Sequence, residues 1–291
     1  MNNKTFPLSD LRGTDLAKKI AKKTFIYTMP FSSENDLTFG GTLTFATYKN
    51  FYGFLTATHV LAKHLNIKEI FAPSIKTNDP NTYFIKGIPI KKIRYLETSE
   101  GIKLLSRADA KWNSSTLDIC FIEIDENIFN ELLKESNKQV VDLQKYQEKY
   151  SSNFKKYCAL NNNWCWGIVG FPREQAKHDK SNIIISKFDG PFFSGGQYKT
   201  DPLKHVHAPF DRDADRCDHE FGTTKDVLPS NFQGISGGGV WQISFCGETI
   251  PEKIDEMFFS GVVVAASPDD LVSRGPEALY NIFLPYLDSL Y

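Results

Sequence analysis

Hydrophobic and polar positions alternate along much of the chain with the period of two that is typical of β-strands. Alternation begins over residues 37–45 and resumes at 54–57, after the turn-like residues 48–50, which predicts a β-hairpin. The same pattern predicts strands over residues 69–72, 82–85, 90–95, 117–124, 164–170, 183–188, 240–245 and 258–265. Many short strands at this spacing favour an all-β barrel or sandwich.

Three segments have helical spacing instead. In residues 1–30, Leu16 and Ile20 fall on one face and lysines on the other, which predicts a surface helix; a basic helix for a membrane or a partner is the alternative. Residues 126–150 predict one or two helices, and residues 277–290 predict a C-terminal helix that Pro285 would kink or end. The predicted organisation is therefore an N-terminal helical extension (1–30), a first β unit (31–125), a helical insertion (126–155) and a second β unit (156–291).

Composition narrows the class of protein. The chain has 291 residues, of which 41% are hydrophobic, so a sizeable core is expected. Net charge is −1, whereas a dedicated nucleic-acid binder normally carries a basic surplus. No apolar run approaches the ~18 residues of a membrane span, and no signal-peptide hydrophobic region follows the N-terminus. The five cysteines form no regular framework, which favours reduced thiols. We expect a cytoplasmic protein with no nucleic-acid or membrane partner.

Three short stretches are candidates for chemistry. The first, Thr56-Ala57-Thr58-His59, presents one histidine at the end of an apolar strand. In the second, Asp118 opens an apolar strand, where a buried carboxylate is costly unless a donor such as a histidine N–H reaches it. The third, Gly-Ile-Ser-Gly-Gly-Gly over residues 234–239, runs into an apolar strand; its glycines permit a turn that aims the N–H groups of Gly234 and Ser236 into one concavity. Taken singly, each stretch also fits an ordinary structural role.

Taken together, the three stretches resemble the chymotrypsin-like (trypsin-like) serine proteases. The resemblance lies in the order histidine, aspartate, serine, and in the motifs Thr-Ala-x-His, aspartate before an apolar strand, and Gly-x-Ser-Gly-Gly. The segments 166–172 and 259–265 resemble the strand that opens the second barrel and the strand that follows the serine in that family. The resemblance covers the chain from about residue 37 onward. It implies an all-β fold, a chymotrypsin-like double six-stranded antiparallel β-barrel, with the histidine and aspartate in the first barrel and the serine in the second.

The resemblance also implies roles. Ser236 would be the nucleophile, His59 its general base and Asp118 the residue that orients the histidine, while the N–H groups of Gly234 and Ser236 would form the oxyanion hole. Should Asp118 point elsewhere, Asp109 is the next candidate. The implied activity is hydrolysis of a protein or peptide substrate through an acyl-enzyme, with no cofactor and no metal. Two alternatives stay open: a catalytically silent module that binds peptides or protein partners in the same cleft, and a protease that needs an activating or regulatory partner.

One departure from the family concerns activation. Ile235 stands where secreted digestive members carry an aspartate that pairs with a new N-terminus after cleavage. An isoleucine cannot make that ion pair, so we do not expect activation of that kind.

Substrate preference and one polar loop are less defined. Ser230 would lie near the base of the substrate pocket, with Val264, Ala265 and Ala266 along its wall, which favours a small or apolar residue before the cut; a loop shift that brought Asp226 there would reverse this. The loop over residues 201–222 is rich in histidine, aspartate and cysteine. A zinc site, a substrate-contacting or regulatory loop and an ordinary surface loop all fit it.

Overall fold

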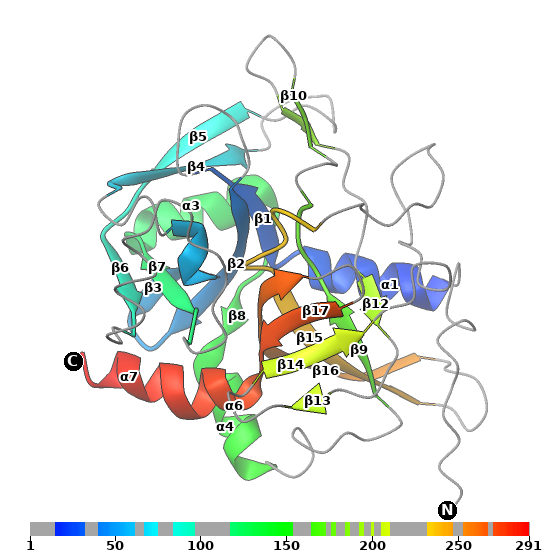
Figure 1. Ribbon diagram of the computed structural model, residues 1–291. Helices are drawn as coiled ribbons and strands as arrows, with labels where there is room; N and C mark the ends of the chain where they lie inside the picture. Colours follow the sequence, from blue (N-terminus) through cyan, green and yellow to red (C-terminus); the bar gives the residue numbers. More distant parts are fainter. Residues whose placement is uncertain are drawn as a thin grey trace, which may run out of the picture.

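A computed structural model describes residues 15–32, 40–61, 67–74, 84–96, 117–153, 164–172, 176–178, 184–186, 192–194, 199–200, 205–209, 232–246, 253–266 and 270–290. Two antiparallel sheets dominate, one from each half of the chain, and they lie beside each other in Figure 1. The mostly antiparallel β architecture predicted from the alternation is therefore confirmed.

The N-terminal sheet has six strands in the order β1-β2-β3-β7-β6, with β8 pairing in parallel to β2. Its strands are β1 (Thr28–Phe31), β2 (Gly41–Tyr48), β3 (Phe51–Thr56), β6 (Lys92–Tyr95), β7 (Cys120–Glu123) and β8 (Val141–Asp142). The predicted hairpin is β2–β3, and its turn residue Lys49 has a φ of 52°. A separate pair, β4 (Glu69–Ser74) and β5 (Phe84–Pro89), joins this sheet through a bridge between Ser32 and Phe71.

The C-terminal sheet has seven strands in the order β12-β9-β15-β16-β17-β14-β13. Its strands are β9 (Trp164–Ile168), β12 (Phe192–Ser194), β13 (Lys199–Thr200), β14 (His205–Pro209), β15 (Gly239–Cys246), β16 (Lys253–Ala266) and β17 (Asp270–Arg274). Strands β10 (Ala176–His178) and β11 (Ile184–Ser186) pair only with each other. Within the described strands neither large sheet closes on itself, so the expected pair of closed barrels is not seen there.

The helices follow the predicted segments, with two corrections. They are α1 (Asp15–Phe25), α3 (Glu126–Ser136), α4 (Leu143–Ser152), α6 (Pro276–Ala278), a π-helical turn (Leu279–Phe283) and α7 (Leu284–Asp288). The first correction is that β1 lies inside the range assigned to the helical extension. The second is that Pro285 does not end the C-terminal helix. Because the Leu284 N–H bonds to Leu279 five residues earlier, the missing N–H of Pro285 falls in the first turn of α7, where proline is tolerated.

Both ends of the chain cross to the opposite sheet (Figure 1). Helix α1 packs against β9 and β16 of the C-terminal sheet, with Leu16 and Ile20 buried as the amphipathic pattern predicted. At the other end, the Tyr286 hydroxyl donates to the Tyr95 carbonyl of the N-terminal sheet at 2.6 Å. The two sheets are therefore held together by the terminal helices as well as by their own contact.

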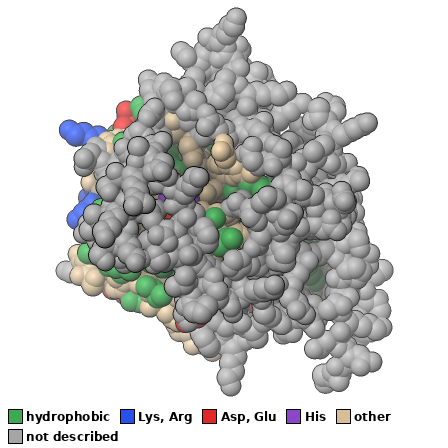
Figure 2. Space-filling view, in the orientation of Figure 1, with side chains coloured by type: hydrophobic (Ala, Val, Ile, Leu, Met, Phe, Trp, Pro, Cys, Tyr) green, Lys and Arg blue, Asp and Glu red, His purple; other side chains and the backbone are tan. Residues whose placement is uncertain are grey.

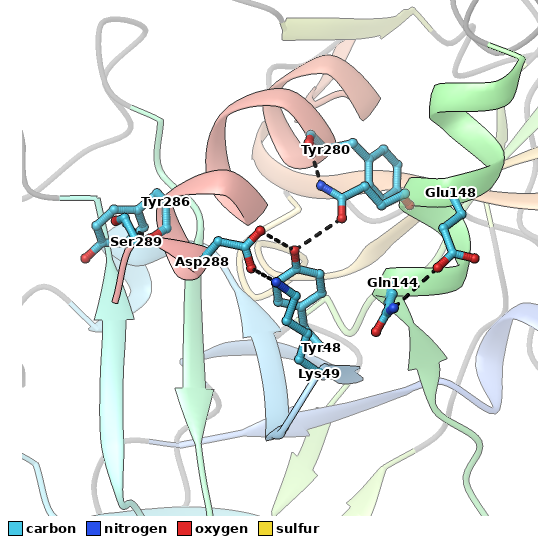
Figure 3. Close-up of polar contacts among 9 residues, drawn as sticks. Tyr48, Lys49, Gln144, Glu148, Tyr280, Tyr286, Asp288 and Ser289 are labelled. Carbon is cyan, nitrogen blue, oxygen red and sulfur yellow. Dashed lines mark hydrogen bonds and ion pairs between the residues drawn. The ribbon is translucent and has the colours of Figure 1, made fainter. Parts of the chain in front are cut away.

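Polar contacts fix the C-terminal helix in place (Figure 3). The Tyr48 hydroxyl lies 3.0 Å from a carboxylate oxygen of Asp288, and Lys49 pairs with the same carboxylate. Gln147 of α4 connects this group to the helix, because its amide accepts from Tyr48 at 3.2 Å and donates to the Tyr280 carbonyl at 3.1 Å. These contacts join β2, α4 and the C-terminal helix at one side of the molecule.

The core is continuous between the two sheets. One cluster combines residues of both halves, and Trp241 lies in it with ring centroids 4.8 Å from Tyr27 and 5.1 Å from Phe259. Trp241 is thus a core residue. A second cluster lies between the N-terminal sheet and α3, where Phe129 packs against Phe45 at 5.9 Å.

Two expectations from composition have partial outcomes. None of the helices in the described ranges is long and apolar enough to cross a membrane. The Cys120 thiol is free and buried, and burial raises its pKa. The side chains of the other four cysteines lie outside the described residues.

Candidate catalytic site

His59 and Asp118 come together at the edge of the N-terminal sheet. His59 lies in a short 3-10 turn, Thr58–Leu61, that follows β3, and Asp118 lies just before β7, the neighbour of β3. The His59 Nδ1 atom is 2.8 Å from one carboxylate oxygen of Asp118, and the His59 backbone N–H donates to the other at 2.9 Å. The carboxylate therefore fixes both the ring and the backbone of His59. Asp109 lies outside the described residues.

The backbone at Asp118 is unusual and helps to place the carboxylate. Its φ is 51°, in the left-handed region, at a position where the chain turns into β7. The Thr58 N–H also donates to the Asp118 carbonyl, at 3.3 Å, so the turn after β3 and the start of β7 are tied twice. Such a conformation persists where the surrounding contacts over-determine it, and here they deliver a carboxylate to His59.

The electrostatics of the pair favour a charged imidazole. The Asp118 side chain is 1% exposed and the His59 side chain 16%, so both groups are largely removed from water. Burial lowers the pKa of His59, whereas attraction to the Asp118 carboxylate and the hydrogen bond between them raise it. The two raising effects outweigh burial, and the pKa of His59 lies above its ordinary value of 6.5.

The candidate nucleophile lies in the segment from Phe232 to Gly238, which we call the serine loop. Within residues 234–238, every carbonyl accepts a hydrogen bond: from the Thr42 hydroxyl (Gly234), the Gly238 N–H (Ile235), the Thr42 N–H (Ser236), the Thr44 hydroxyl (Gly237) and the Val263 N–H (Gly238). Three of the five N–H groups donate, those of residues 235, 237 and 238. The N–H groups of Gly234 and Ser236 have no acceptor among the described residues, and both residues are only half-buried.

Glycine is required at two positions of the loop. Gly234 has a φ of 92° and Gly237 a φ of 93°, both in the left-handed region. A Cβ at Gly237 would overlap the Thr42 carbonyl oxygen and the Thr56 hydroxyl. The glycine-rich motif thus allows the serine loop to lie directly on β2 and β3 of the N-terminal sheet, and the alternative of a merely flexible loop does not fit this part of it.

The histidine segment and the serine loop meet at Gly41. A Cβ on Gly41 would lie 2.6 Å from Cγ1 of Val60, which follows His59, and 3.1 Å from the carbonyl oxygen of Ser236. The two segments are therefore within a side chain's length of each other, although 177 positions separate the two residues (236 minus 59).

The serine hydroxyl has a different partner from the one expected in a triad. Ser236 Oγ lies 3.5 Å from the Val264 carbonyl oxygen, and the described contacts include no hydrogen bond between Ser236 and His59. A register shift between Val263 and Ala265 leaves Val264 without a partner in β17, and such a bulge turns its carbonyl out of the strand ladder. At 3.5 Å this hydrogen bond is long for two oxygens, so it holds the hydroxyl weakly.

The predicted pocket residues are only partly described. Val264 is buried beside Ala57, and Ala265 packs at the edge of the same small cluster. Ser230, Asp226 and the side chain of Ala266 lie outside the described residues. Residues 205–209 of the polar loop form β14, while 210–222 are also outside. Among the residues that the structure describes, no group of three metal-ligating side chains is found.

Sequence reasoning missed the threonines that hold the serine loop. Thr42, Thr44 and Thr56 are fully buried, and each places its hydroxyl in a hydrogen bond at this contact. The available signal was three threonines in the central strands of a buried sheet, where a hydroxyl needs a partner. That signal marks polar contacts without indicating which segment supplies them.

The face shown in Figure 2 places the described charged side chains at its margin. Lysine and arginine (blue) lie at one side, over the N-terminal sheet, whereas a small histidine surface (purple) and hydrophobic side chains (green) lie nearer the middle. Comparison with known proteins adds no assignment: the chain matches no protein-family model and no curated protein sequence.

Proposed function

We propose that the protein is a serine endopeptidase of the chymotrypsin-like class, which cleaves a protein substrate through Ser236, His59 and Asp118. The observation that carries the proposal is the hydrogen-bond pattern of the serine loop. Its polar backbone groups from 234 to 238 are paired except for the N–H groups of Gly234 and Ser236, which flank the candidate nucleophile. Two unpaired N–H groups beside a serine are what an oxyanion requires.

The residues divide the chemistry as follows. In its neutral form, His59 removes the Ser236 proton while the oxygen attacks the scissile carbonyl carbon, and the carbonyl π electrons move to its oxygen. The tetrahedral oxyanion accepts hydrogen bonds from the N–H groups of Gly234 and Ser236. The imidazolium then protonates the leaving amine as the C–N bond breaks, and water, activated by the same His59, hydrolyses the acyl-enzyme. Asp118 holds the proton on Nδ1, so that Nε2 is the basic nitrogen.

Before this step the serine side chain must turn. Its hydrogen bond to the Val264 carbonyl is long, at 3.5 Å, and rotation about one side-chain bond releases it. Catalytic hydrogen bonds are often loose without substrate and tighten in the complex. We therefore propose that substrate binding moves the Ser236 hydroxyl to His59. No cofactor takes part in this scheme.

The double-barrel arrangement is part of the proposal. Two antiparallel sheets, one from each half, meet where the serine loop of the second lies on β2 and β3 of the first. This placement at the junction supports a chymotrypsin-like fold. On the sequence grounds given above, we propose a protein substrate with a small or apolar residue before the cut, and a cytoplasmic site of action.

A second candidate function is a silent module that binds peptides in the same cleft. The observation that favours it is the bond from Ser236 to Val264 in place of one to His59. On this alternative the His59–Asp118 pair would be structural, and no covalent intermediate would form.

Labelling with a fluorophosphonate probe separates the two. The probe forms a covalent bond only with an activated serine. We expect the native chain to be labelled, Ser236→Ala and His59→Ala to be unlabelled, and Ser289→Ala, which changes an exposed serine at the C-terminus, to be labelled like the native chain. A native chain that stays unlabelled with and without cell lysate would exclude the peptidase and favour the binding module.

A further inference from the structure

The serine loop is fixed by the core of the opposite sheet. The Thr42 hydroxyl donates to the Gly234 carbonyl at 2.8 Å, and its backbone N–H donates to the Ser236 carbonyl at 2.9 Å. The Thr44 hydroxyl donates to the Gly237 carbonyl at 3.0 Å. Three of the peptide groups that define the loop are therefore held from strand β2.

The threonines are themselves held in place. The Thr56 hydroxyl of β3 donates to the Thr42 carbonyl at 2.8 Å, and the Thr42 hydroxyl also accepts from the Phe171 N–H at 2.9 Å. Thr42 thus lies where β2, β3, the segment after β9 and the serine loop meet. Since β2 and β3 are inner strands of the N-terminal sheet, this contact cannot rearrange without disturbing that sheet.

The remaining anchor of the loop is apolar. Ile235 is 1% exposed and packs on Gly170, where a Cβ would overlap the isoleucine side chain. Burial of an isoleucine requires no charged partner, so this position needs no newly created amine and no protein partner to hold it. The described contacts of the loop all come from within the folded chain.

We propose that Thr42, Thr44 and Thr56 are positioning residues that keep the serine loop in its working conformation, so that the folded chain is active without proteolytic cleavage and without an activating partner. This inference rests on the proposed peptidase function. The free N–H groups of Gly234 and Ser236 are then available before substrate arrives, because every neighbouring carbonyl is already engaged.

The test uses the purified full chain and measures the maximal labelling rate and the apparent affinity of the fluorophosphonate separately. We expect the native chain to be labelled alone, with no gain on adding lysate. In Thr42→Val the hydroxyl is lost at nearly constant shape, and the maximal rate should fall roughly 10²-fold with little change in probe affinity. The pH midpoint of labelling should stay unchanged, because His59 is untouched. Thr42→Ser, which keeps the hydroxyl, should recover most of the rate.

The control is Thr47→Val, at a half-exposed position of the same strand, and it should label at the native rate. Each variant is assayed at a temperature where circular dichroism shows it folded. If Thr42→Val does not fold, Thr44→Val decides, because it removes only the bond to Gly237. A native maximal rate in folded Thr42→Val or Thr44→Val would overturn the positioning role. Labelling of the native chain only with lysate would overturn activity without a partner and leave the peptidase intact, whereas no labelling under either condition would overturn the peptidase itself.

Discussion

Asp118→Asn is the change that addresses the histidine most directly. Asparagine has nearly the shape of aspartate and is one of the residues that tolerate the left-handed backbone, here a φ of 51°. Its amide oxygen can still accept from the His59 N–H, now 2.9 Å from a carboxylate oxygen. The amide NH₂ would then face Nδ1, 2.8 Å away, and a donor in that place requires Nδ1 to be an acceptor.

The consequence is the wrong tautomer of the imidazole. With the proton on Nε2, His59 cannot take the proton of Ser236, and the labelling rate should fall by about 10⁴-fold, or about 5 kcal/mol in the activation barrier. The charge on Asp118 is also lost, so burial is left as the main influence and the pKa of His59 should fall. Because neutral His59 is the base, the pH midpoint of the residual activity should move to lower pH.

The assay is the fluorophosphonate labelling rate measured between about pH 5 and pH 9, the range in which histidine titrates. The matched control is Asp125→Asn, since asparagine caps a helix about as well as the aspartate that now accepts from the Asn127 N–H. The control should keep the native rate and midpoint. A rate for Asp118→Asn within tenfold of native, or a midpoint that does not move down, would refute the role of Asp118 in orienting His59.

Three further predictions concern the loop, the pH dependence and the C-terminal helix. Gly237→Ala adds a methyl group against the Thr42 carbonyl at a φ of 93°, and we expect a loss of more than about 2 kcal/mol in unfolding free energy together with slower labelling, measured by urea denaturation and the probe; native values for both would contradict the contact. Because the folded pKa of His59 is raised, its pairing with Asp118 stabilises the fold fully below the unfolded pKa and is lost as pH rises through the folded one, so thermal stability should fall over the same range in which activity rises, and His59→Gln should abolish that slope. Tyr280→Phe removes the buried hydroxyl that donates to a β16 carbonyl at 2.6 Å and should cost about 1 kcal/mol with no change in labelling rate; an unchanged melting temperature would count against that contact.

Much of the local structure could be predicted from the sequence because it depends on neighbouring residues. Alternation of side chains marks strands wherever one face is buried, which is why the β2–β3 hairpin and β15 were predicted near their observed bounds. The helices of the insertion follow from the spacing of residues such as Phe129 and Leu132, both buried. Where two local rules competed, the prediction failed: β1 was absorbed into the helical extension, and a π-helical turn accommodates Pro285.

The candidate site divides along the same line. Sequence motifs named His59, Asp118 and Ser236, since each motif is a short run with its own local chemistry. What the sequence by itself could not supply is the contact between segments far apart in the chain. The Thr42 hydroxyl meets the Gly234 carbonyl across 192 positions, and only the packing of one sheet on the other brings them to 2.8 Å. The sequence therefore determined which groups are available, and the tertiary structure decided which backbone N–H groups are left free beside the serine, because that depends on hydrogen bonds whose partners only the folded chain brings together.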